Sequence, residues 1–201
     1  MNLISNILYW ISTGLLVPVI VLLIFFFIRA LIMIGGFFGQ YLQMKKTTAV
    51  IYAKLTGLNT DTLADFEKQL PSESGSVLIA YIRKVIEAGA DRSKADLLIS
   101  EYEIEADKEL STSKTLTKMG PILGLMGPLI PMGPALVGLA SGDIASMAYN
   151  MQVAFATTVV GLVVSAIGFV TQQTKERWAA KNLTILEYLA DIVEKEKGGR
   201  K

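Results

Sequence analysis

Three long apolar stretches divide the chain. They run from about Trp10 to Phe38, from Met119 to Ala140 and from about Met147 to Thr171, and each is long enough to cross a bilayer as an α-helix. The polar residues gather in two blocks, Met44 to Lys118 and Lys175 to Lys201. This pattern predicts an all-α integral membrane protein with three transmembrane helices and long cytoplasmic helical extensions.

The same pattern predicts the order of segments along the chain. Ahead of the first span, Leu3, Ile7 and Ile11 recur at helical spacing, which is typical of a short amphipathic helix on the membrane surface. We therefore expect an outer interfacial helix (1–9), a first transmembrane helix with its extension (10–43), a cytoplasmic helical domain (44–118), a second transmembrane helix (119–140), an external turn (141–146), a third transmembrane helix (147–172) and a cytoplasmic C-terminal helix (173–201).

The two polar blocks are predicted to be helical. In the first block we expect helical segments at Asp61–Pro71 and Ser76–Ala88, and a third from Ser93 that runs directly into the second span. Apolar residues at helical spacing provide packing faces in the second segment (Leu78, Ile82 and Val85) and in the C-terminal tail (Ile185, Leu189 and Ile192). The dense charges of the third segment, from Ser93 onward, are typical of a solvated helix face.

The positions of lysine and arginine orient the spans. Basic residues follow the first span (Lys45 and Lys46), precede the second (Lys114 and Lys118) and follow the third (Lys175, Arg177 and Lys181). The turn from Ser141 to Ser146 carries only Asp143, and no basic residue precedes the first span. Because positive charge is retained on the cytoplasmic side, we expect the N-terminus outside, the C-terminus in the cytoplasm, and a location in the plasma (inner) membrane.

Arg29 interrupts the first apolar stretch. A charge at the bilayer centre would be costly, so we expect its side chain to reach the cytoplasmic boundary of the membrane. The membrane segment would then lie nearer Trp10 to Ile28, and the residues up to Phe38 would form a packed extension.

The second span carries a stripe of small and ring-closed residues. Its members follow one another at steps of four, three, four, three and four: Gly120, Gly124, Gly127, Pro131, Pro134 and Gly138. This spacing places them on one helical face, and we expect that face, with Pro121 and Pro128, to form a packed wall that another backbone can approach closely. The prolines also free backbone carbonyl groups.

The third span carries a stripe of its own, in which small residues alternate with polar ones. Its members are Asn150, Ala154, Thr158, Gly161, Ser165, Gly168 and Gln172, again at steps of three or four. Two interpretations stay open, and they are compatible. The face is either a helix seam with hydroxyls bonded to the preceding turn, or a water-accessible path.

Composition narrows the possible functions. The 201 residues are 52% hydrophobic with a net charge of +1, which makes nucleic-acid binding unfavourable. Cysteine and histidine are both absent, so we expect no metal site, no cofactor and no enzymatic activity. None of the three membrane cores contains Asp, Glu, His or Lys. If the protein moves ions, the titrating carboxylate must therefore come from another chain.

Residues Gly120 to Val170 resemble the second and third spans of the MotA/TolQ/ExbB proton channel family. Gly124-Leu125-Met126-Gly127 is similar to the family's GLxG signature, and Ala156 to Leu162 is similar to its threonine-containing segment in span three. The resemblance implies a homopentamer whose second and third spans line a central pore. It also implies that this pore encloses the single spans of two partner subunits, which supply an essential Asp.

The resemblance also implies roles for individual residues. Thr158 matches the family's threonine that faces the partner carboxylate, and Pro121 resembles the proline that opens span two in flagellar members. Two positions depart from the pattern: Pro128 replaces the threonine that commonly follows GLxG, and Gln152 and Val153 lie where an acidic residue is often found.

The sequence thus predicts the pore-forming subunit of an ion-gradient-driven, proton-coupled motor or stator complex embedded in the lipid bilayer. The predicted ion-pathway or partner-facing residues are Thr158, Thr157, Ser165, Gln172 and Asn150, and the predicted pore-wall packing residues are Gly120, Pro121, Gly124, Gly127, Pro128, Pro131, Pro134, Gly138, Ala154, Gly161 and Gly168. The alternative is an oligomeric membrane scaffold that conducts no ions.

Overall fold

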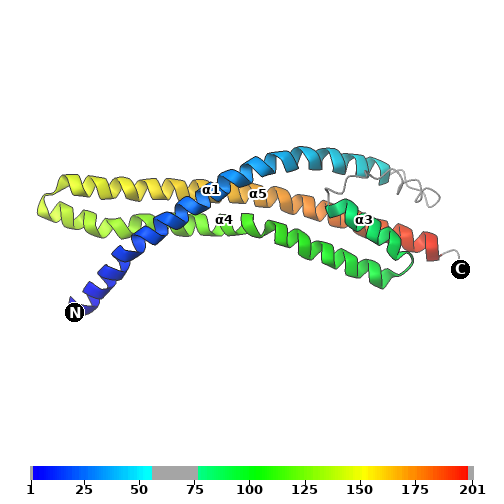
Figure 1. The fold of residues 1–201 in the computed structure, drawn as a ribbon, viewed down its shortest axis with the longest axis horizontal. Helices are drawn as coiled ribbons and strands as arrows, with labels where there is room; N and C mark the ends of the chain where they lie inside the picture. The colour runs from blue at the N-terminus through cyan, green and yellow to red at the C-terminus, as the bar shows by residue number, and fades with distance from the viewer. Residues whose placement is uncertain (1, 56–76, 199–201) are drawn as a thin grey trace. The chain divides into compact units, whose positions relative to one another are not determined.

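The structure, a computed structural model, describes residues 2–55 and 77–198, and these residues form four helices, of which the last three are joined by short turns (Figure 1). The helices are α1 (Asn2–Leu55), α3 (Val77–Ala88), α4 (Arg92–Ser141) and α5 (Ile144–Gly198). Three of them, α1, α4 and α5, are long and apolar enough to cross a membrane. The predicted all-α fold with three spans is therefore confirmed for the described part of the chain.

The helices are longer than the predicted segments. The expected interfacial helix at 1–9 is not a separate element, because α1 continues without a break from Asn2. Pro18 lies inside α1, and the helix continues through it because backbone groups in lipid have no other partners than those within the helix. The expected run from Ser93 into the second span is present as α4. The predicted segment Asp61–Pro71 lies outside the described residues.

A two-residue turn joins α4 to α5. Gly142 has a positive φ of 76°, which glycine adopts without steric cost, and its N–H donates to Leu139 O at 3.2 Å. The Asp143 N–H donates to Gly138 O at 2.8 Å, so the pair of bonds forms a Schellman motif that ends α4. The Asp143 carboxylate then accepts from Ser146 N at 3.0 Å and caps α5. The two helices are consequently antiparallel neighbours (Figure 1).

A glycine with positive φ and an aspartate N-cap also join α3 to α4. Gly89 has a φ of 66° and ends α3, and the Asp91 carboxylate accepts from Lys94 N at 3.1 Å at the start of α4. The cap satisfies one of the N–H groups that a helix start leaves without an internal partner.

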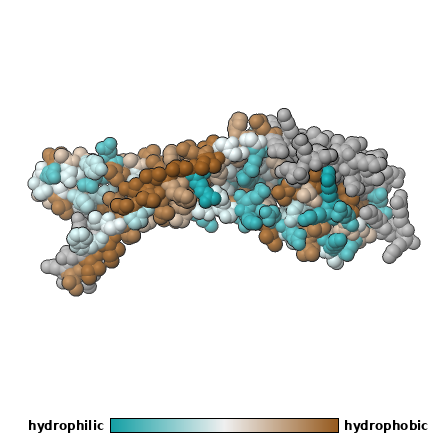
Figure 2. Space-filling model, in the orientation of Figure 1, coloured by the Kyte–Doolittle hydropathy of each residue, from teal (hydrophilic) through white to brown (hydrophobic). Residues whose placement is uncertain are grey.

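The chain divides into two compact units. The first comprises Met1–Phe37 and Thr112–Gln173, and we call it the membrane unit. The second comprises Phe38–Ser111 and Thr174–Lys201, and we call it the polar unit. The surface of α1 in the membrane unit is mostly brown in Figure 2, and teal side chains gather on the polar unit.

In the membrane unit, α1 packs against α4 and α5 through two small clusters. Val19 and Leu23 of α1 meet Leu123 of α4 in the first cluster. In the second, the fully buried Ala30 of α1 meets Leu116 and Val164. These contacts hold α1, from Val19 to Ala30, against the α4–α5 hairpin.

The polar unit has a larger core of aliphatic side chains. The predicted packing faces are both confirmed: Leu78, Ile82 and Val85 of α3 are buried, and so are Ile185 and Leu189 of α5, while Ile192 is partly buried. Ile99 of α4 and Ile51 of α1 complete this core with their neighbours. The buried faces recur every three or four residues, which is the period of an amphipathic helix.

Candidate functional site in the membrane unit

The two predicted stripes face each other within one chain, where α4 and α5 pack backbone against backbone. A Cβ added at Gly161 would lie 2.6 Å from both Gly120 O and Gly124 Cα. A Cβ added at Gly120 would lie 2.6 Å from Gly161 O. Real Cβ atoms do not approach backbone atoms so closely, so only glycine fits at these positions. The stripe of the third span therefore forms a helix seam, which is the first of its two interpretations.

The seam continues towards both ends of the hairpin. A side chain at Gly127 would overlap Thr157, and one at Gly168 would lie 2.6 Å from Thr117 N. At Gly138 an added Cβ would lie 3.1 Å from Asp143 O, next to the turn. Ala154 is buried in the same seam at 2% exposure. These small residues let the two helices approach closely, as small residues commonly do in membrane proteins.

Two hydroxyl groups of α5 donate across the seam to carbonyl oxygens of α4. Thr158 Oγ1 donates to Gly124 O at 3.1 Å, with Ala154 O also 3.0 Å away, and Ser165 Oγ donates to Thr117 O at 3.0 Å. Thr157 instead bonds within its own helix, to Val153 O and Ala154 O.

The prolines of α4 explain why those two carbonyls accept. A proline has no N–H, so the carbonyl four residues before it loses its helical partner. Pro128 frees Gly124 O, and Pro121 frees Thr117 O, which are the two acceptors of the cross-helix bonds. Pro121 and Pro128 are thus each matched with one hydroxyl, and the departure from the family pattern at Pro128 supplies the acceptor for Thr158.

The other predicted site residues differ in how far their side chains are buried. Pro131 is buried, whereas Pro121, Pro128 and Pro134 are half-buried. Gln172 is half-buried near the end of the membrane unit. Asn150 is half-buried near the turn, and its Nδ2 donates to Ser146 O at 2.9 Å.

Arg29 lies on an exposed side of α1, next to the fully buried Ala30. Ala30 contacts Leu116, which lies two residues before Lys118, the last charge ahead of the second span. The Arg29 backbone is therefore at the height where the apolar part of α4 begins, which agrees with a side chain at the membrane boundary.

Sequence reasoning did not find the buried polar pair of the polar unit. Asn182 Nδ2 donates to the Tyr102 hydroxyl at 2.8 Å, and Asn182 is only 2% exposed. Burial raises the pKa of Tyr102 above its usual value, and the hydrogen bond from Asn182 opposes this in part. The two residues are 80 positions apart, and their local patterns are those of ordinary helix residues. Only the tertiary structure reveals the pairing.

Comparison with known proteins gives one family match that covers the seam. Residues 72–187 match the MotA/TolQ/ExbB proton channel family, and this range contains the whole hairpin seam. A comparison with curated protein sequences gives no match. Since the family match extends over more than half of the 201 residues, the chain belongs to the MotA/TolQ/ExbB proton channel family.

Proposed function

We propose that this chain is the pore-forming subunit of a membrane motor or stator complex that is driven by an ion gradient. In this proposal five copies form a ring, α4 and α5 line its pore, and protons pass on an Asp from the single-span partner subunits inside it. Family membership supports the channel role. The observation that carries the proposal further is the seam itself, because it places hydroxyl groups within membrane cores that lack Asp, Glu, His and Lys.

The hydrogen bonds of the Thr158 hydroxyl determine whether it can donate to a partner subunit or accept from it. Its single hydroxyl proton is directed at Gly124 O and Ala154 O. The lone pairs of the oxygen are then available to accept a hydrogen bond. In the proposed complex, Thr158 would accept from a protonated carboxyl group or from a water molecule, and Ser165 and Gln172 would continue the path.

Proton flux into liposomes tests this role. The chain alone should be proton-tight, and flux should require coexpression with a single-span partner that carries a membrane Asp. Thr158→Val removes the acceptor at constant size and should lower flux at least tenfold, whereas Thr158→Ser should retain most of it. Thr115→Val, the same change on an exposed residue before the second span, is the matched control. Parent-like flux from Thr158→Val at every pH would remove Thr158 from the pathway.

The orientation in the plasma membrane is a separate part of the proposal. Reporter fusions at Lys54 and Lys195 should both report the cytoplasm, and a fusion at Gly142 should report the outside. A cytoplasmic signal at Gly142 would reverse the hairpin and contradict this arrangement.

The alternative is an oligomeric membrane scaffold that conducts no ions. One observation favours it: Thr157, Thr158 and Ser165 all have hydrogen-bond acceptors within their own chain, as packing residues would. The liposome experiment separates the two functions, because a scaffold gives no flux even with the partner present.

A further inference from the structure

The polar unit has a groove of about 470 Å³ between α4 and α5. Its floor includes Ala106, Ala179 and Leu183. Among the described residues, its lining includes three acids and no lysine or arginine (Glu103, Asp107 and Glu176). Ile104, at the edge of the groove, is 69% exposed. The groove thus combines an apolar floor with a negatively charged rim.

A different face of α5 carries the opposite charge. Arg177, Lys181, Thr184 and Tyr188 follow one another at steps of four, three and four, and all are exposed. We call this face the basic ridge. Arg92 and Lys108 take part in ion pairs of the polar unit, whereas neither Arg177 nor Lys181 takes part in one among the described residues. Tyr188, at 48% exposure, adds an apolar surface to the ridge.

The groove and the basic ridge cannot meet within one chain. A helix turns by about 100° per residue. The ridge therefore lies on the face of α5 next to the one that Ala179 and Leu183 present to the groove, and two faces of one helix cannot contact each other. The ridge of one chain can reach only the groove of another.

We propose that the groove receives the basic ridge of a second copy of this chain. Charge complementarity supports this occupant. Among the described residues, neither Glu103 on the rim nor Lys181 on the ridge takes part in an ion pair, so each can pair with the other across two chains. Because the two surfaces differ, the contact is heterologous, and repeating it produces a ring if the rotation closes. This inference rests on the proposed oligomeric channel and names the contact between its subunits.

Introduced cysteines test the contact directly, since the chain has none of its own. One population carries Glu103→Cys and the other carries Lys181→Cys, and the two are coexpressed and treated with a short bismaleimide in membranes. We expect a covalent dimer in the mixture, at least tenfold above either population alone. The doubly substituted chain should form a ladder up to the closed oligomer. Pairing Lys181→Cys with Glu87→Cys, on the exposed side of α3, is the matched control.

Charge reversal provides a second measurement. Glu103→Lys and Lys181→Glu should each reduce the dimer yield between cysteines at Ala180 and Tyr188, and their combination should restore it. Absence of a dimer in the mixture, an equal dimer from the Glu87 control, or linkage of the groove cysteine to another protein would overturn the inference. The cross-linking result and the proton flux are independent measurements. An intact, conducting oligomer without the cross-link would refute the contact alone. A cross-linked oligomer that never conducts would refute the proposed function alone.

Discussion

Helices α4 and α5 pack against each other in both units, but they do so by different means. In the membrane unit, glycines bring the backbones together, and hydroxyls donate across the seam to Gly124 O and Thr117 O. In the polar unit, the same two helices contribute large aliphatic side chains, such as Ile99 and Leu189, to a shared core.

The difference follows from the solvent. In water, burying apolar side chains is favourable, so a core of leucine and isoleucine stabilises the polar unit. In lipid, that driving force between helices is absent, and close packing and hydrogen bonds take its place. Many large apolar residues of the membrane unit are accordingly exposed, and Leu125 and Val159 are exposed at 63% and 61%.

A large side chain in the seam should have the largest effect on the membrane unit. We expect Gly161→Leu to abolish folding of the hairpin, because even a Cβ would lie 2.6 Å from two backbone atoms of α4. Gly133→Leu is the control, since nothing lies within 4 Å of a Cβ at that position. The measurement is the yield of monodisperse protein in detergent and its thermal unfolding. Equal yields for both variants would contradict a backbone-to-backbone seam.

A second prediction concerns the polar unit, where large side chains should be essential. Leu189 is fully buried, and Leu189→Ala should reduce the free energy of unfolding by about 2–5 kcal/mol. Leu162→Ala, at a site in the membrane unit that is 56% exposed, should have a much smaller effect. Denaturant unfolding in detergent checks both values. A larger loss from Leu162→Ala would reverse the roles assigned to the two units.

A third prediction concerns the buried polar pair. Tyr102→Phe leaves the Asn182 amide without its acceptor and should cost about 1–3 kcal/mol. Adding Asn182→Leu removes the unpaired amide, so the double variant should recover most of that loss. If the double variant is as unstable as the single one, hydrogen bonding at this site does not stabilise the core.

The pH dependence sharpens this prediction. The folded-state pKa of Tyr102 is raised above the ordinary value of 10.0, first of all by burial. The protonated hydroxyl is therefore favoured in the folded state, and its contribution to stability is complete below pH 10.0 and lost as the pH rises through the folded-state pKa. Unfolding free energies measured from pH 8 to pH 11 should fall more steeply for the parent than for Tyr102→Phe.

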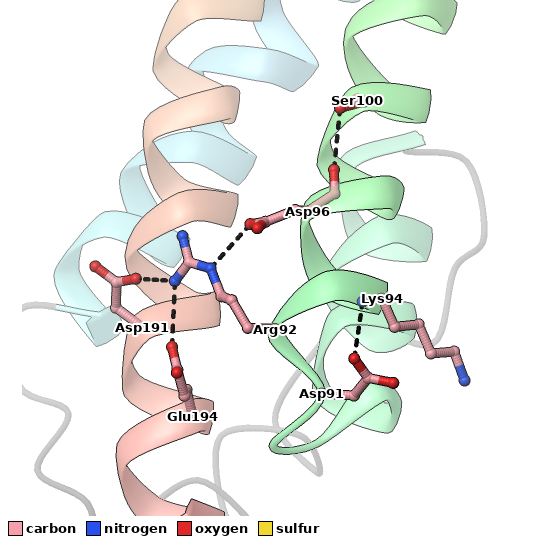
Figure 3. A network of polar contacts seen from close by, with 7 residues as sticks. All are labelled: Asp91, Arg92, Lys94, Asp96, Ser100, Asp191 and Glu194. Atoms are coloured by element: carbon pink, nitrogen blue, oxygen red, sulfur yellow. Dashed lines mark hydrogen bonds and ion pairs between the residues drawn. The ribbon is translucent and has the colours of Figure 1, made fainter.

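The smallest expected effect belongs to the exposed ion pairs at the start of α4. Arg92 contacts Asp96 on α4 and both Asp191 and Glu194 on α5 (Figure 3). Because these groups are solvated, Arg92→Gln should reduce the free energy of unfolding by less than about 1 kcal/mol, and the difference should vanish in high salt. A loss above 2 kcal/mol that persists in 1 M salt would show that this network, and not only the aliphatic core, holds the polar unit together.

Much of this fold could be predicted from periodicity. The apolar runs predict α1, α4 and α5, and the faces that contain Leu78 and Leu189 predict which sides are buried. The stripe that contains Gly120 and Gly124 predicts a close approach. Periodicity identifies a face but not the surface it meets, so it could not show that the two stripes pack against each other within one chain. It could not show the groove either, because a groove depends on how two helices separated in sequence diverge.

The pairs of proline and hydroxyl could have been predicted in part. The loss of an N–H at Pro121 and Pro128 identifies Thr117 O and Gly124 O as freed acceptors from the sequence alone. What the sequence lacks is the register between α4 and α5, which decides which hydroxyl reaches which carbonyl. The structure supplies that register through Thr158 and Ser165.

This matching constrains the order in which the positions can change during evolution. If Thr158 loses its hydroxyl while Pro128 remains, Gly124 O is left in the membrane without a donor. If Pro128 changes first, the new residue brings an N–H that can restore the helical bond to Gly124 O, and Thr158 can still bond to Ala154 O. Proline should therefore be lost before the hydroxyl in descendants of this sequence, and chains that keep Pro128 but lack a hydroxyl at position 158 should be rare.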